Sequence, residues 1–203
     1  MSAKALTLSI LAAALYSWPA LAQYRPRGKS VGPSIGASVF FGMGKMGNDT
    51  DVLKRSMIHT PVSIFAGFNW KRLRFAVNYE YNLIGQSDDP ASYSNQNIGG
   101  KGSSVGPRLG YYDGKQAFDV VYRASEKFTL DKPTLAGTVA EYEGKGGYSI
   151  QYYRQLKKRV GLVLDYTSME LRSPQGNSND IKWDRVALGL VLTNFEGSGR
   201  RTR

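Results

Sequence analysis

The clearest pattern in the chain lies between Lys71 and Leu83, where every second residue is apolar or aromatic. The apolar set consists of Leu73, Phe75, Val77, Tyr79, Tyr81 and Leu83. The positions between them, from Arg74 onward, are small, polar or charged. A period of two places the two sets on opposite faces of a β-strand. The segment therefore predicts a strand with one apolar face and one polar face.

The same alternation returns in seven further segments, at residues 34–43, 62–70, 104–111, 118–125, 147–152, 160–167 and 185–193. The connections between the eight segments alternate strictly between long and short. The long ones are residues 45–60, 84–102, 126–145 and 171–180, and the short ones lie around residues 71, 114 and 156. This rhythm predicts an all-β, antiparallel up-and-down meander of eight strands. Its long connections lie at one end, and its short turns and both termini lie at the other, as in membrane barrels.

The less apolar face of these strands collects charges of both signs among many small residues. Its charged members are Arg74, Glu80, Arg108, Asp119, Arg123, Asp165 and Arg185. An eight-stranded barrel has an interior just wide enough for side chains, and buried charges must be paired. We therefore expect this set to form a charge network inside the barrel. Arg74 and Glu80 are too far apart along one strand to pair, so their partners must come from other strands.

Two directions are open for the apolar face. A soluble, lipocalin-type barrel would turn it inward and leave the charges outside, whereas a membrane barrel turns it toward lipid. The apolar face carries tyrosine and tryptophan toward the strand ends, at Trp70, Tyr79, Tyr81, Tyr111, Tyr148, Tyr152 and Tyr166. Such residues suit an interfacial aromatic girdle. Together with the balanced charges, they favour a transmembrane barrel.

The first residues have the pattern of a cleavable signal peptide. Lys4 precedes an apolar run that is too short to span a bilayer, and Ala20-Leu21-Ala22 follows as a small-x-small cleavage signature. We therefore expect a signal peptide at 1–22, a basic periplasmic lead-in at 23–32, the barrel at 33–195 and a basic periplasmic tail at 196–203. The chain has no cysteine, which excludes disulfides and thiolate metal sites.

These strands resemble the small eight-stranded outer-membrane proteins of the OmpA/OmpX kind. The resemblance lies in pattern and covers nearly all of the chain after the signal peptide. In that family the last strand ends at an aromatic residue read by the insertion machinery, and Leu190 to Phe195 looks similar. Here residues 196–203 follow it, so the matching signal is internal. The resemblance implies a location in the bacterial outer membrane.

The net charge of +11 is concentrated in the parts predicted to face the periplasm. The strongest contributors are Arg25, Arg27, Lys71, Arg72, Arg154, Lys157, Lys158 and Arg159. Nucleic acid, a common partner of basic clusters, is not expected for a secreted chain. Beyond the lipids of the membrane itself, anionic headgroups or the cell wall are the candidate partners at this end, by screened electrostatic attraction. A role in orientation alone is the alternative.

Little in the sequence points to catalysis. Some eight-stranded outer-membrane barrels are lipid-modifying enzymes that use a histidine with a serine and a carboxylate. The only histidine, His59, lies near Ser56 and Ser63 without recognisable triad spacing. We therefore expect no enzyme, no cofactor and no metal. The first interpretation is a structural or interaction barrel with a plugged lumen and long external loops available for a partner that the sequence does not identify. The alternatives are a small pore and, third, a lipid-modifying enzyme.

Overall fold

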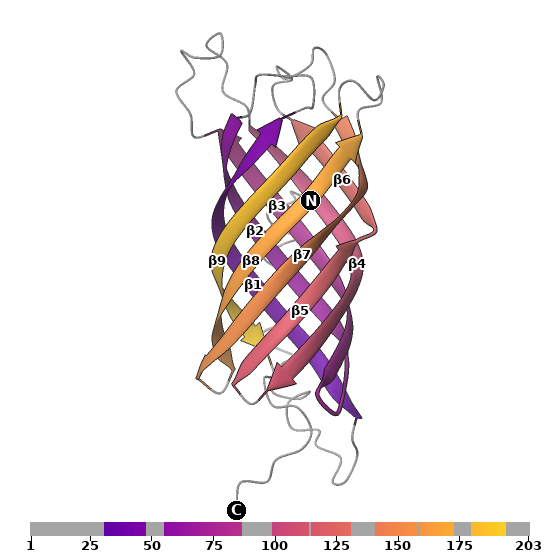
Figure 1. Cartoon of the computed structure of the whole chain (residues 1–203), viewed down its shortest axis with the longest axis vertical. Helices are drawn as coiled ribbons and strands as arrows, with labels where there is room; N and C mark the ends of the chain where they lie inside the picture. Colours follow the sequence, from indigo (N-terminus) through magenta and orange to yellow (C-terminus); the bar gives the residue numbers. More distant parts are fainter. Residues whose placement is uncertain are drawn as a thin grey trace, which may run out of the picture.

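The computed structural model describes residues 31–47, 55–86, 99–113, 115–130, 141–157, 159–172 and 180–193. Its regular elements are β-strands, wound at a steep tilt around one long axis (Figure 1). Their bounds are β1 Val31–Gly47, β2 Arg55–Trp70, β3 Leu73–Gln86, β4 Gly99–Asp113, β5 Gln116–Arg123, β6 Ser125–Leu130, β7 Glu141–Lys157, β8 Val160–Arg172 and β9 Ile181–Thr193. No helix in the described ranges is long and apolar enough to cross a bilayer.

All neighbouring strands are antiparallel, and the sheet closes on itself. Each strand pairs with the next along the chain, except β5 with β6, and β1 pairs with β9 from Gly36↔Thr193 to Gly47↔Lys182. Strands β5 and β6 both lie between β4 and β7, so they are two halves of a single strand of the barrel. Each strand position around the barrel is called a stave below, and β5 and β6 share one stave. The lower half is β5 and the upper half is β6 (Figure 1). The barrel therefore has eight staves, and the predicted fold class is confirmed.

The two ends of the barrel differ in their connections. At one end, called the turn end here, short connections join β2 to β3, β4 to β5 and β7 to β8. The first of these turns contains Lys71, which has a positive φ of 54°. At the opposite end, called the upper end, the strands are joined through residues 48–54, 87–98, 131–140 and 173–179, which lie outside the described residues.

A belt of apolar side chains surrounds the outside of the barrel. Its members include Phe41, Val77, Leu109, Val120, Ile150, Leu164 and Leu188, with Val77 60% and Leu188 58% exposed. Soluble monomers rarely expose contiguous apolar patches beyond a few hundred Å², and this belt includes residues from every stave. Lipid is the solvent that suits such a surface. The apolar face therefore points outward, as the membrane interpretation predicts, and a lipocalin-type lumen is excluded.

The strands extend well beyond this belt at the upper end, where the sequence predicted loops. Strand β7 has 17 residues, and at about 3.3 Å per residue and a tilt of about 45° it rises about 40 Å, against an apolar band of about 25 Å. Residues 84–86 and 126–130, which were expected to be loop, are strand. The boundaries predicted for residues 45–60, 84–102, 126–145 and 171–180 were therefore wrong.

The strand boundaries were mispredicted because the alternation reverses above the belt. There the apolar residues point into the barrel and the polar residues point outward. Trp183 in β9 is fully buried, and its neighbours Lys182 and Asp184 are exposed on the outside. Tyr142 in β7 is buried between exposed Glu141 and Glu143. Above the lipid the wall meets water, so polar residues point outward and apolar residues point inward, as in a soluble barrel.

Two neighbouring strands of the barrel contain a bulge: the β5/β6 strand, at the junction of its two halves, and β7. The register of β4 shifts by one residue between Arg108↔Val121 and Val105↔Ser125, and that of β7 shifts between Gly144 and Gly146. Gly146 has a φ of 112°, which side chains rarely allow. In the β5/β6 strand the extra residue is Ala124, and this residue changes which positions of the β5/β6 strand point inward. Its buried positions are odd up to Arg123 and even from Glu126 onward.

Candidate functional site: the barrel interior

The structure places all seven charged residues predicted for the lumen inside the barrel, each at most 2% exposed. In the half nearer the turn end, Asp119 joins two arginines. Its Oδ2 accepts hydrogen bonds from Arg74 Nη1 and Arg108 Nε, each at 2.5 Å. The two guanidinium carbons lie 4.5 and 4.0 Å from the ring centroid of Phe65. This packing adds cation–π stabilisation to the ion pairs.

In the upper half of the network, two arginines share Glu80. Arg185 Nη1 donates to Glu80 Oε1 at 3.0 Å, and Arg123 Nη2 donates to Glu80 Oε2 at 2.9 Å. Arg185 also donates through Nη2 to Asp165 Oδ2 at 2.8 Å. The partners of Glu80 and of Arg74 thus come from other strands.

Gln151 connects the two halves into one network. Its Oε1 accepts a hydrogen bond from Arg108 Nη2 at 2.8 Å, and its Nε2 donates to Asp165 Oδ1 at 2.8 Å. The connected side chains run from Arg74 through Asp119, Arg108 and the neutral Gln151 to Asp165, Arg185, Glu80 and Arg123. Because low dielectric strengthens each of these bonds, the network holds the staves together from within.

One member of the network, Glu126, was not predicted from the sequence. It is 4% exposed, and its Oε1 accepts a hydrogen bond from Arg123 Nη1 at 3.4 Å. With Glu126 the network contains four arginines and four carboxylates, so the interior charges balance. The residue was assigned to a loop because the bulge at Ala124 breaks the alternation just before it. The sequence does contain a strand signal here, in Glu126-Lys127-Phe128. Glu126 and Phe128 point inward, and Lys127 between them points outward.

Apolar clusters lie above and below the charged layer. The upper cluster consists of Met46, Met57, Ile84, Phe128, Tyr142, Met169, Leu171, Ile181 and Trp183. The lower cluster consists of Phe40, Tyr112, Ala117, Tyr153, Val163, Ala187 and Val191. Each of these side chains is at most 7% exposed. The charged layer therefore lies between two apolar layers, which keep bulk water away from it.

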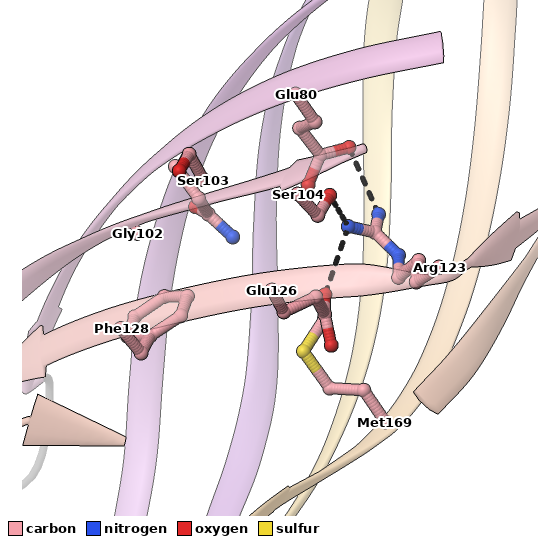
Figure 2. Close-up of a pocket in the computed structure, with 9 residues that line it drawn as sticks. Glu80, Gly102, Ser103, Ser104, Arg123, Glu126, Phe128 and Met169 are labelled. Atoms are coloured by element: carbon pink, nitrogen blue, oxygen red, sulfur yellow. Dashed lines mark hydrogen bonds and ion pairs between the residues drawn. The ribbon is translucent and has the colours of Figure 1, made fainter. Parts of the chain in front are cut away.

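A small recess lies where the charged layer meets the upper cluster. Figure 2 shows Arg123 at its side, linked to Glu80, Ser104 and Glu126. Both side-chain polar atoms of Asn82, another lining residue, lack a partner within the described part of the chain. The side chains around it leave no room for a water molecule.

His59, the only histidine, lies inside the barrel in the upper apolar layer. It is fully buried and stacks on Trp183, with ring centroids 4.6 Å apart. Trp183 Nε1 donates a hydrogen bond to His59 Nε2 at 3.2 Å. This histidine therefore packs as part of the upper cluster, away from the lipid-facing surface.

Comparison with known proteins places the fold. No protein-family model matches the sequence, and the search of curated proteins found no match. Among solved structures, the chain is similar to neisserial surface protein A (NspA), with 14% sequence identity and a TM-score of 0.53 over 81% of this chain and 99% of that one. It is also similar to Ail, the attachment invasion locus protein of Yersinia pestis, in a complex with the heparin analogue sucrose octasulfate. That match has 10% identity and a TM-score of 0.53, over 79% of this chain and 98% of the other.

This chain has the fold of the small outer-membrane β-barrels. The predicted resemblance is thus confirmed at the level of fold. Together with the apolar belt, the fold places the barrel in the bacterial outer membrane, as predicted. The matches cover almost the full length of both solved barrels.

The basic residues predicted at the periplasmic side of this outer-membrane barrel fall at its turn end. Lys71, Arg72, Arg154, Lys157 and Arg159 are all exposed there. Arg25, Arg27 and Lys158 belong to the same prediction and lie outside the described residues. The signal peptide, the tail and residues 23–30 of the lead-in also lie outside them and stay predictions, whereas Val31 and Gly32 of the lead-in begin β1.

Truncating Trp183 is expected to lower the free energy of unfolding by about 3–5 kcal/mol, as is typical of large-to-small core changes. The indole is fully buried, and it contacts both the ring of His59 and, edge-on at 4.7 Å, that of Phe128. Equilibrium unfolding of Trp183→Ala in urea, in the presence of lipid vesicles, measures the change. Thr60→Ala, at an exposed position beside His59, is the control and is expected to change stability by less than about 0.5 kcal/mol. Equal effects for the two variants would contradict a tightly packed upper cluster.

Proposed function

We propose that this outer-membrane barrel has a structural or interaction role, with a lumen plugged by its own side chains. The observation that carries the proposal is the layered interior. Four buried arginines and four buried carboxylates are linked across the barrel, between two apolar clusters. Moving an ion along this axis would require breaking paired charges in a dry environment, which is costly.

The interaction role is assigned to the upper end. The wall there continues beyond the apolar belt and is reinforced on its outer surface, where Lys145 forms ion pairs with Glu170 and Asp180. Such a wall is a rigid base for the connecting segments, which the sequence predicts to be long external loops. Binding residues are often found on loops positioned by a rigid scaffold.

The runner-up function is a small pore, and conductance distinguishes the two. The purified chain, reconstituted in a planar lipid bilayer, is expected to show no stable current steps under conditions in which a general porin conducts. Steady, ion-selective current from the wild-type chain would contradict the plugged lumen. Gln151→Ser, which removes the link between the two halves of the network, serves as a comparison. If a current is seen, a change in its size on this substitution identifies the lumen as its path.

The lipid-modifying enzyme has less support. His59 is enclosed in the upper apolar layer, and its Nε2 accepts the hydrogen bond from Trp183. A general base must lie within hydrogen-bond reach of the proton that it removes. A lipid at the outer surface of the barrel would not reach this imidazole.

A further inference from the structure

The turn end repeats one arrangement three times. Each short turn has a cationic residue whose backbone carbonyl accepts a hydrogen bond from the neighbouring stave. The carbonyl of Arg72 accepts from Tyr112 N at 2.8 Å, that of Lys115 from Gln155 N at 2.8 Å, and that of Arg159 from Thr193 N at 3.0 Å. The backbone of each turn is thus fixed to the barrel wall. The cationic side chains therefore extend from fixed backbone positions around the turn end, called the rim below, and a fixed backbone lowers the entropy cost of binding an anion.

The rim meets the aromatic edge of the apolar belt. Lys71 Nζ lies 5.4 Å from the ring centroid of Trp70, and Arg72 Nη1 donates to the Tyr111 hydroxyl at 3.1 Å. Trp70 and Tyr111 are each 45% exposed on the outside of the barrel. Because such side chains mark the boundary between hydrocarbon and headgroups, the adjoining cations lie at the depth of the lipid phosphates.

Five cations of the rim are not compensated by a carboxylate within the described part of the chain. Lys71, Lys115, Arg154, Lys157 and Arg159 are exposed and form no ion pair there with a carboxylate. At the upper end, by contrast, Lys145 lies between two carboxylates. The rim therefore has cations available for an external anion.

We propose that this rim binds the phosphate groups of anionic glycerophospholipids in the periplasmic leaflet. The defining residues are Lys71, Arg72, Lys115, Arg154, Lys157 and Arg159. Cell-wall carboxylates are the competing source of negative charge, but they would have to enter the headgroup layer to reach cations beside Trp70 and Tyr111. The proposal rests on the membrane placement of the barrel and is independent of whether the lumen is plugged.

Fluorescence quenching of Trp70 by brominated lipid tests the proposal. The full mature chain is reconstituted in equimolar vesicles of phosphatidylglycerol and phosphatidylcholine, with bromine on one lipid or the other. Trp183 is enclosed in the barrel, and Trp70→Phe confirms the origin of the signal. We expect brominated phosphatidylglycerol to quench Trp70 at least about twofold more strongly than brominated phosphatidylcholine. The preference should fall toward one in high salt, because salt screens exposed charges.

Two variants with equal charge changes locate the effect. The rim variant has Lys71, Lys115, Arg154 and Lys157 replaced by glutamine, and it is expected to lose the preference. The control has Lys45, Lys101, Lys127 and Lys182 replaced by glutamine, all on the outer wall near the upper end, and it should keep the preference. An unchanged preference in the rim variant would overturn the proposal.

Further outcomes separate the competing explanations. Equal quenching of the wild type by both lipids, combined with rim-dependent sedimentation with purified cell-wall sacculi, would overturn the proposal in favour of the cell wall. If neither brominated lipid quenched Trp70, the membrane placement itself would be wrong. That failure is distinct from the loss of headgroup preference alone.

Discussion

Replacing Asp119 with asparagine is expected to lower the free energy of unfolding by about 3–5 kcal/mol, the cost of breaking a buried ion pair from one side. Both Arg74 and Arg108 donate to its Oδ2, and all three side chains are buried in the lower half of the network. An amide there leaves two guanidinium groups without their ionic partner. Urea titration in lipid vesicles, with heat-modifiable gel mobility as the readout of the folded barrel, measures the loss.

The control for this variant is Asp184→Asn, which removes a carboxylate of the same kind from the outer wall. Asp184 is exposed and lies near Tyr166 OH at 3.4 Å, so the expected change is within about 0.5 kcal/mol. Adding Arg74→Met to Asp119→Asn should recover part of the loss, because one unpaired buried charge is then removed. A loss below about 1 kcal/mol for Asp119→Asn would show that water reaches these arginines and that the interior is not closed.

Placing arginine at Leu188 is expected to cost about 2–4 kcal/mol, the range for a cation on the lipid face near the middle of a bilayer. Leu188 is paired with Phe41 on β1 and with Leu164 on β8, inside the apolar belt. The same titration measures this loss for Leu188→Arg. In a barrel surrounded by water, an outward arginine at this exposed position would change stability little.

Ser168→Arg provides the matched control at a different depth. Ser168 is on β8, opposite Asp184 on β9, above the belt, and arginine there is expected to cost about 0–1 kcal/mol. Equal costs at the two positions would argue against a lipid-facing belt. A clear difference between them would measure how sharply the belt ends.

Much of the barrel could be predicted from the sequence, because within the belt each stave separates polar from apolar residues with a period of two. Arg74, Glu80 and Asp165 follow that rule, and the structure brings them into one network. The pairing partners could not be predicted. Alternation fixes the face of a residue, whereas the tilt and register of the closed sheet decide which residues meet across it.

The strands in the upper third of the barrel were not predicted, because this part of the wall is surrounded by water and not by lipid. Trp183, Tyr142 and Phe128 point inward, although an outward apolar face had been expected of every strand. A search for alternation of either polarity would have found Lys182-Trp183-Asp184 and Glu141-Tyr142-Glu143. Such a search would not have placed Glu126 in the barrel interior, because a bulge of one residue moves it onto the inner face.

The pairing of β1 with β9 joins strands from opposite ends of the chain, and it has a consequence for how the barrel forms. Until this seam closes, β1 and β9 are edge strands with unpaired backbone groups, and each such group costs several kcal/mol in hydrocarbon. Contacts such as Gly36↔Thr193 also have a large sequence separation, which slows folding. A partly closed sheet is therefore unstable in the bilayer, so insertion and closure must occur together. Deleting β9 should therefore block assembly altogether, because the seven strands that remain would leave a seam whose backbone groups lipid cannot pair.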